Sequence, residues 1–412
     1  MKNSIEIWNL SNGIRVVSEN IKKSLSVYVS IVANVGTRDE FPEENGIAHL
    51  FEHMAFKGTQ KRKPWHILNA IDSVGGEINA FTTREKTCFY TYTSKPYLKK
   101  SIDLLTDIVF HSNFPYEELV KEKQVIYDEI NMYKDMPEES IFDDFEELLF
   151  PDHSLGLPIL GSQSTLENIT EINLRNFREK NYSASNLVIC VVGNFRKDLL
   201  ELYCKNFLEN LNLSKEQKHR ETVKKNQYFE KNLVKKFKQA HLILGGISCS
   251  YHSDDFYPFS LLIHYLGGDT MNNLLNLNIR EKYGICYNIH SFFVPYQDTG
   301  IWGIYAGFDD SNYKKLKKLI YKELSKLIND GISVQKLQRI KKQFIGHLIL
   351  SNENNFNKMQ RYAKNLLDFQ KIIPLEETIE QIQKINKEQI QEIARKYFDL
   401  SNLSQLTYFP AV

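Results

Sequence analysis

The sequence has few of the features that mark secreted, membrane-spanning or nucleic-acid-binding proteins. Its five cysteines are scattered and never form a C-x-x-C pair, which argues for a reducing compartment and against a thiolate metal site. The first residues lack the apolar core of a secretory signal, and no apolar run approaches the roughly 20 residues that cross a bilayer. The net charge of +1 gives no general attraction to nucleic acid or anionic lipid. We therefore expect a cytoplasmic protein that binds neither membranes nor nucleic acid.

The length of the chain and the order of its expected elements indicate two domains built on one plan. At 412 residues the chain is long for a single domain. After a polar, lysine-rich stretch at 212–236, the second half repeats the first: strand, acidic loop, helix, strand pair, long helices. We predict an α+β protein with two similar domains, 1–211 and 237–412, joined by a solvated linker at 212–236. Each domain should hold a mainly antiparallel sheet covered by long helices.

The individual elements follow from hydrophobic periodicity and from turn residues. Alternating apolar residues predict strands, which we expect at 5–8, 14–17, 24–33, 77–81, 87–93, 186–192, 241–247, 286–293 and 300–308. Longer periodic stretches predict helices, which we expect to include about 96–110, 115–135, 165–180, 256–265, 310–329, 333–351 and 376–396. A further helix should carry the stretch around residue 50 and end near Gly58, and another should run from Pro64 to Gly75.

The stretch His49-Leu50-Phe51-Glu52-His53 is the most informative part of the chain. Two histidines four residues apart lie on one helix face, one turn from each other, so both imidazoles can reach one metal ion. Glu52 lies beside them, which makes the stretch the inverted form of the H-E-x-x-H zinc motif. A lone histidine beside an apolar stripe is usually just packed, but two with a glutamate between them predict metal binding. The corresponding second-half stretch, 261–265, lacks the motif, so we expect one Zn²⁺ per chain.

A catalytic zinc needs a third protein ligand, and the best candidate lies in the helix expected at 115–135. Glu122 and Glu129 fall on its apolar stripe, seven residues apart. A carboxylate on an inward stripe costs several kcal/mol unless it is paired or bound to a metal. We predict that Glu129 binds the zinc and that Glu122 orients one of the other ligands. The alternative is a buried ion pair between these glutamates and a lysine or arginine.

The motif within 46–59, followed by Glu129, resembles the pitrilysin- or insulinase-like zinc metallopeptidases. The resemblance is strongest to the mitochondrial-processing-peptidase-like branch, whose subunits have about this length and two similar halves. It implies that a zinc ion is bound by two histidines and the distal glutamate, that the motif glutamate is the catalytic base, and that the other glutamate supports the site. In this chain those residues are His49, His53, Glu129, Glu52 and Glu122.

The resemblance also implies where a peptide substrate binds. The stretch 75–82 is similar to the family's active-site edge strand, on which substrate pairs as an added strand; its central residues here are Asn79, Ala80 and Phe81. The stretch 278–287 is similar to a patch whose arginine and tyrosine hold the substrate and polarise the scissile carbonyl. Arg280 and Tyr287 match those positions, although by themselves they would be interpreted as a surface residue and a strand residue.

These observations lead us to expect a zinc-dependent endopeptidase that hydrolyses peptides or processes unfolded precursor segments inside a dimeric chamber. Relatives often divide the zinc site and the arginine–tyrosine pair between two subunits, whereas this chain has both. We therefore expect a homodimer in which Arg280 and Tyr287 act on the partner's zinc site. One alternative is a non-catalytic structural or regulatory subunit of the same fold, although such chains usually lose the motif. Another is an S-ribosylhomocysteine lyase, which is much smaller and uses a cysteine as third ligand.

Overall fold

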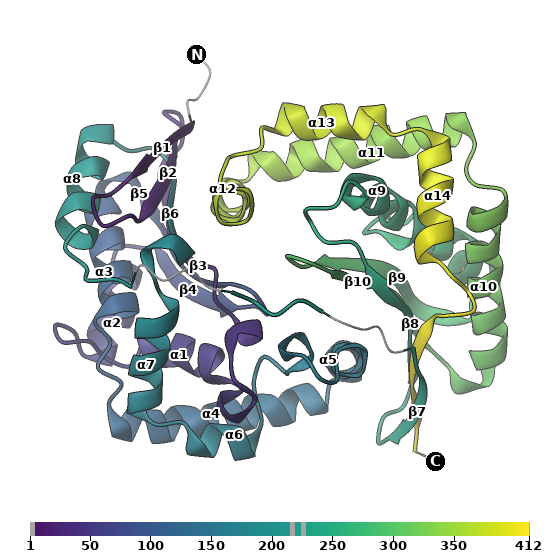
Figure 1. Cartoon of the computed structure of the whole chain (residues 1–412), viewed down its shortest axis with the longest axis horizontal. Helices are drawn as coiled ribbons and strands as arrows, with labels where there is room; N and C mark the ends of the chain where they lie inside the picture. Colours follow the sequence, from purple (N-terminus) through teal and green to yellow (C-terminus); the bar gives the residue numbers. More distant parts are fainter. Residues whose placement is uncertain (1–4, 215–218, 224–227, 412) are drawn as a thin grey trace. The chain divides into compact units, whose positions relative to one another are not determined.

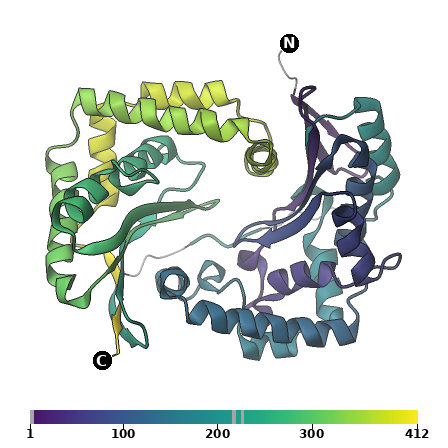
Figure 2. The same ribbon diagram turned by 180° about the vertical axis from the view of Figure 1, so that it is seen from behind.

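The computed structural model describes residues 5–214, 219–223 and 228–411, and these form two compact units. Unit 1 comprises Met1–Ile130, Leu157–Glu221 and Ser351–Ile372, and unit 2 comprises Asn131–Gly156, Thr222–Leu350 and Ile373–Val412. Each unit is a sheet with helices on both faces, as Figures 1 and 2 show from opposite sides. The expected α+β class with two similar domains is confirmed.

The two sheets have the same plan. Sheet 1 has the order β1-β2-β6-β3-β5-β4 and sheet 2 the order β7-β11-β8-β10-β9. Within each sheet only one pair is parallel, β2 with β6 and β7 with β11, and the other neighbours are antiparallel. The five neighbouring strands β2-β6-β3-β5-β4 therefore have the same order and the same pairing directions as the five strands β7-β11-β8-β10-β9. An internal duplication predicts this match. The strands are β1 Ile5–Asn9, β2 Arg15–Asn20, β3 Ser26–Ala33, β4 Glu77–Thr82, β5 Thr87–Ser94, β6 Leu187–Gly193, β7 Glu230–Lys235, β8 Ala240–Ser248, β9 Cys286–Pro295, β10 Gly300–Phe308 and β11 Ser404–Pro410.

The helices of each unit enclose a main core on one face of the sheet and a smaller core on the other. In unit 1 the main core lies under α1 Ile47–Ala55, α2 Pro64–Asp72, α3 Leu98–Phe110, α4 Tyr116–Lys134, α6 Gln163–Asn168, α7 Glu171–Asn181 and α8 Lys197–Leu208. In unit 2 it lies under α9 Phe256–Gly267, α10 Tyr313–Asn329, α11 Val334–Glu353, α13 Leu375–Lys384 and α14 Lys387–Tyr397. Apolar side chains spaced three and four apart give each helix its buried stripe.

The smaller core of each unit includes one helix from the other half of the sequence. Helix α12, Asn355–Phe369, comes from the second half but packs on β3 and β6 of unit 1 through residues that include Met359 and Leu366. Helix α5, Pro137–Leu149, comes from the first half but packs on β8 and β11 of unit 2. The sequence predicted domains that are continuous in sequence, at 1–211 and 237–412, whereas the compact units are discontinuous.

The stretch at 212–236 differs from the solvated linker that its composition suggested. Strand β7 occupies Glu230–Lys235 and pairs with β11. Arg220 is buried, with its side chain 5% exposed, and forms an ion pair with Asp39 at 2.9 Å. Its guanidinium also donates to the carbonyls of Asn34 and Glu85. The described part of this stretch is therefore anchored within unit 1 as far as Glu221; residues 215–218 and 224–227 lie outside the described residues.

Other differences concern elements that were missed or merged. The single helices expected at 165–180 and 376–396 are each two helices, α6 with α7 and α13 with α14, and in each pair a new N-cap begins the second helix. Helices α5, α8 and α12 and strands β7 and β11 were not expected. All five cysteines are buried and free. Within the described residues, no helix is both long and apolar enough to cross a membrane.

Candidate metal centre

Helix α1 presents the motif because its other face is fixed in the core of unit 1. The apolar stripe of Ile47, Leu50, Phe51 and Met54 is completely buried, which leaves His49, Glu52 and His53 on the neighbouring stripe. The first turn of the helix is held by Glu40, whose carboxylate accepts the backbone N–H groups of Gly46 and Ala48 and the side-chain amide of Asn45, each at 2.8 Å. Burial raises the pKa of Glu40 to about 8, while these three donors oppose the shift. An acceptor at a helix N-terminus satisfies backbone donors that have no partner inside the helix.

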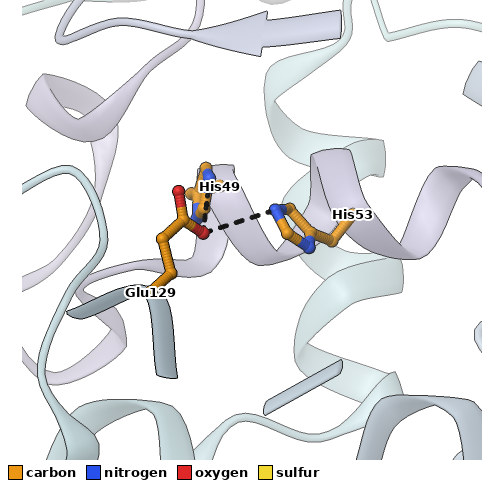
Figure 3. A group of neighbouring side chains, drawn as sticks. All are labelled: His49, His53 and Glu129. Atoms are coloured by element: carbon orange, nitrogen blue, oxygen red, sulfur yellow. Dashed lines mark ion pairs between the residues drawn. The ribbon is translucent and has the colours of Figure 1, made fainter. Parts of the chain in front are cut away.

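His49, His53 and Glu129 converge on one point (Figure 3), as the sequence predicted. Oε2 of Glu129, on α4, lies 3.9 Å from Nε2 of His49 and 3.8 Å from Nε2 of His53. One ligand atom from each of the three lies within 4.8 Å of the others, and no second such group of three occurs among the described residues. His49 is 8% exposed, whereas His53 and Glu129 are half-buried, so the point of convergence is open on one side.

The donor set and its electrostatics fit a zinc ion. Two imidazole nitrogens and one carboxylate oxygen are typical ligands of a catalytic zinc, which keeps a further position open. A tetrahedral ion with bonds of about 2.1 Å holds its ligand atoms about 3.4 Å apart, close to the distances to Glu129. Burial and the charge of His53 lower the pKa of His49 to about 3, so this imidazole is neutral, as a metal ligand must be. Burial raises the pKa of Glu129, a cost that a bound cation would offset.

Glu122 contacts His53, one of the two histidines that it was predicted to orient. Its Oε2 lies 3.0 Å from Nδ1 of His53, which leaves Nε2 of that ring facing Glu129. Its Oε1 lies 2.6 Å from the ammonium of Lys57. Burial alone would raise the pKa of Glu122, but the partners His53 and Lys57 together lower it. The ion pair weighed as an alternative for these glutamates therefore exists at Glu122, together with the contact to His53 and not in place of it.

Glu52 is 9% exposed and accepts a hydrogen bond from the hydroxyl of Thr82 at 2.5 Å. Burial raises the pKa of Glu52, opposed by the Thr82 hydrogen bond and by His53. A carboxylate with a raised pKa beside a metal site is suited to take up and return a proton. Sequence reasoning did not assign Thr82, Lys57 or Glu40. Lys57 lies four residues after His53, just past the end of α1, and this spacing could have indicated its role.

The predicted substrate-binding residues lie on an edge strand. Strand β4 is the last strand of sheet 1 and pairs only with β5 within that sheet. Asn79 and Phe81 are exposed, and Ala80 is half-buried. The backbone N–H of Ala80 donates to its neighbour's side chain, Oδ1 of Asn79, at 2.8 Å. That N–H therefore points away from β5, toward the free edge.

Arg280 and Tyr287 belong to unit 2. Arg280 lies in a helical turn, Asn276–Glu281, where its guanidinium donates to Oδ1 of Asn276 and Oε1 of Glu281. Tyr287 lies on β9 and is 59% exposed. These positions agree with the surface residue and strand residue that the local sequence predicted. Their role in catalysis stays a prediction.

The comparisons with known proteins agree with this centre. A family model described as insulinase (peptidase family M16) matches residues 15–163, which include all the residues of the centre, and a model described as the peptidase M16 inactive domain matches 168–344. An uncharacterized zinc protease of Bacillus subtilis is 35% identical over 96% of each chain. Another, of Rickettsia felis, is 33% identical over 97% of this chain and 96% of its own.

This chain belongs to the insulinase family of peptidases. Solved structures with less than 25% identity support the fold. A protease from Helicobacter pylori has a TM-score of 0.90 at 23% identity, over 99% of this chain and 100% of its own. A protein from Pseudomonas fluorescens described as a peptidase M16 inactive domain has a TM-score of 0.92 at 18% identity, over 99% of both chains. The closer resemblance to processing peptidases stays a prediction.

Proposed function

We propose that the protein is a zinc-dependent endopeptidase with one Zn²⁺ per chain. The observation that carries the proposal is the convergence of His49, His53 and Glu129, with Glu52 beside them on α1. Glu52 is not needed to hold the ion, because the other three residues complete the protein's share of a catalytic zinc site. A buried carboxylate next to such a site, with a raised pKa, is the group that peptide hydrolysis requires as a base.

The residues of the chain divide the chemistry between them. When bound, zinc supplies a Lewis acid that polarises the scissile carbonyl and acidifies water. Glu52 takes the proton of the attacking water and delivers it to the leaving amine. The Thr82 hydroxyl keeps the Glu52 carboxylate oriented, and Glu122 keeps Nε2 of His53 facing the site. The backbone N–H of Ala80 now donates a hydrogen bond to the side chain of Asn79. A peptide added as a strand to β4 would accept this hydrogen bond in its place.

A non-catalytic structural or regulatory role is the competing proposal, because one matched family model and one similar structure are described as inactive domains. That model covers 168–344 and excludes the motif. The residues His49, Glu52, His53 and Glu129 all lie in the stretch matched by the other model. An inactive subunit has no need to keep a base beside three metal ligands, so we favour the peptidase.

Cleavage of a mixed peptide library, with and without a chelator, tests the peptidase directly. We expect the zinc-loaded chain to cleave, the chelator to abolish cleavage, and Glu52→Gln to keep zinc while losing cleavage. Asp128→Asn, an exposed change on α4, is the control and should behave as wild type. A Glu52→Gln chain with full activity would contradict the mechanism, and a wild-type chain that binds no zinc would favour the structural role.

We also propose a homodimer in which Arg280 and Tyr287 hold the substrate at the partner's zinc site. The support is that this chain has both the zinc residues and the arginine–tyrosine pair that relatives often divide between two subunits. Mixing inactive Glu52→Gln chains with inactive Arg280→Ala chains should restore part of the activity, because some sites then combine two intact contributions. If mixed dimers form and remain inactive, the residues do not act in trans.

A further inference from the structure

A cavity of about 390 Å³ lies between α2 and the edge strand β4, away from the metal ligands. Helix α2 contributes Trp65, Leu68, Asn69 and Asp72, β4 contributes Glu77 and Ile78, and Gly76 lies just before β4. The four helical residues are spaced i, i+3, i+4 and i+7, so they form one face of α2. The core-facing stripe of the same helix is a different one, with Ile67 and Ile71 completely buried.

Large apolar side chains on this face are open to solvent. Trp65 is 67% exposed and Leu68 is 56% exposed, although Ile67 and Ile71 of the same helix are buried in the core of unit 1. Glu77 also lines the cavity, and its carboxylate accepts a hydrogen bond from the hydroxyl of Tyr92. Tyr92 lies opposite Glu77 on β5, and Glu77 alternates with Ile78, whose side chain packs toward the main core. Trp65, Leu68 and Ile78 form the apolar part of the wall, and Asn69, Asp72 and Glu77 form its polar part.

The alternation along β4 ties this cavity to the proposed substrate position. Ile78, Ala80 and Thr82 share one face of the strand: Ile78 and Ala80 pack against the main core, and the Thr82 hydroxyl meets Glu52. A peptide residue paired directly opposite one of these three points its side chain to the same face. The residue opposite Thr82 would lie beside the catalytic base. The residue opposite Ile78 would lie four positions away, about 13 Å along the strand, with its side chain directed at the cavity.

We propose that this cavity is a substrate subsite, which accepts a large apolar side chain about four residues from the scissile bond. The proposal rests on the proposed peptidase function and on substrate pairing with β4. The indole of Trp65 and the side chains of Leu68 and Ile78 would cover the bound side chain, and Asn69 and Asp72 would remain at its polar rim. A volume of this size lies in the range of small-molecule pockets and suits a phenylalanine or leucine side chain.

The test uses twelve-residue peptides of alanine, serine and threonine in which a single phenylalanine is moved one position at a time. With the zinc-loaded full chain, we expect the cleaved bond, mapped by mass spectrometry, to move with the phenylalanine and to stay about four residues from it. In a Trp65→Ser, Leu68→Ser chain the cleaved bond should no longer follow the phenylalanine. The KM of the best peptide should rise about tenfold, since apolar burial is lost, with kcat little changed.

The matched control is Ile172→Ser on α7, which removes another exposed apolar side chain, 64% exposed, and should behave as wild type.

Fluorescence anisotropy of the same peptides on the Glu52→Gln chain separates this inference from the peptidase proposal, because it needs no cleavage. Phenylalanine peptides should bind more tightly than peptides without phenylalanine, and Trp65→Ser, Leu68→Ser should abolish this difference. That result supports the subsite even if no cleavage occurs. Cleaved bonds that ignore the phenylalanine, with unchanged binding in the double variant, would overturn it. Loss of self-association without loss of peptide binding would instead assign the face to an interface between copies.

Discussion

Helix α1 of unit 1 and helix α9 of unit 2 have equivalent positions in the two similar units. Helix α1 lies between β3 and β4 in the sequence, and α9 lies between the equivalent strands β8 and β9. Where α1 has His49, Glu52 and His53, the corresponding stretch 261–265 of α9 has Leu261, His264 and Tyr265. The repeated fold therefore supplies a position for the helix, and three side chains decide whether that position can hold a metal.

The helices that would supply the third ligand differ as well. In α4, Glu122 and Glu129 lie on the inward side, where Lys57 and the two histidines accommodate their charge. In unit 2, α11 has basic residues and has no acidic residue before Glu353 at its end. A carboxylate would be costly to bury there without a metal or a cation. The difference between the two units in residues that could bind a metal thus extends to two elements.

The sharpest way to break the comparison is to change one histidine in each unit. His53→Gln should abolish zinc binding and peptidase activity, because it removes one of three ligands. His264→Gln, on α9, should leave both unchanged. Zinc content by atomic absorption and peptide cleavage check both variants. Zinc lost from the His264→Gln chain and kept by the His53→Gln chain would reverse the assignment.

Glu129→Gln should remove most of the zinc, since a neutral amide is a much weaker ligand than a carboxylate. The control Asp128→Asn changes the neighbouring residue, which is exposed and bonded to Gln124. It should bind one zinc per chain, like wild type. Equal zinc content in the two variants would show that Glu129 is not a ligand.

Glu122→Gln should weaken zinc binding by about 10- to 100-fold, as is usual when a residue that orients a histidine ligand is changed. The loss arises because Nδ1 of His53 and the Lys57 ammonium lose their common carboxylate partner. Competition with a chromogenic chelator measures the affinity. Glu118→Gln, which changes a partly exposed carboxylate on the same helix paired with Lys121, is the control. An unchanged zinc affinity in Glu122→Gln would show that Glu122 only forms a structural ion pair with Lys57 and does not support zinc binding.

Thr82→Val should have the smallest effect. The Thr82 hydrogen bond lowers the pKa of Glu52, which burial otherwise raises. Without it, Glu52 is protonated to higher pH, so the acidic limb of the pH–activity profile should move upward. Activity below neutral pH should fall about two- to tenfold. A uniform loss at all pH values would mean that the threonine acts through substrate binding instead.

The sequence was sufficient to predict which residues lie together at the candidate metal centre and to predict the two similar units. Helical spacing placed His49 and His53 together, and two glutamates on an apolar stripe indicated Glu129 and Glu122. It was insufficient for the exchange of α5 and α12, because periodicity shows that a helix has an apolar face but not which sheet receives it. It also missed Thr82, since a threonine on a strand has no pattern of its own, and the anchoring of Arg220, because its neighbours are those of a solvated segment.

The central claim is that unit 1 alone holds the metal, and anomalous X-ray diffraction at the zinc edge from crystals of the zinc-loaded chain tests it most directly. The account predicts one strong anomalous peak per chain, within bonding distance of Nε2 of His49, Nε2 of His53 and a carboxylate oxygen of Glu129. A principal peak elsewhere, such as beside His264 in unit 2, or the absence of a peak among these three residues, would contradict it.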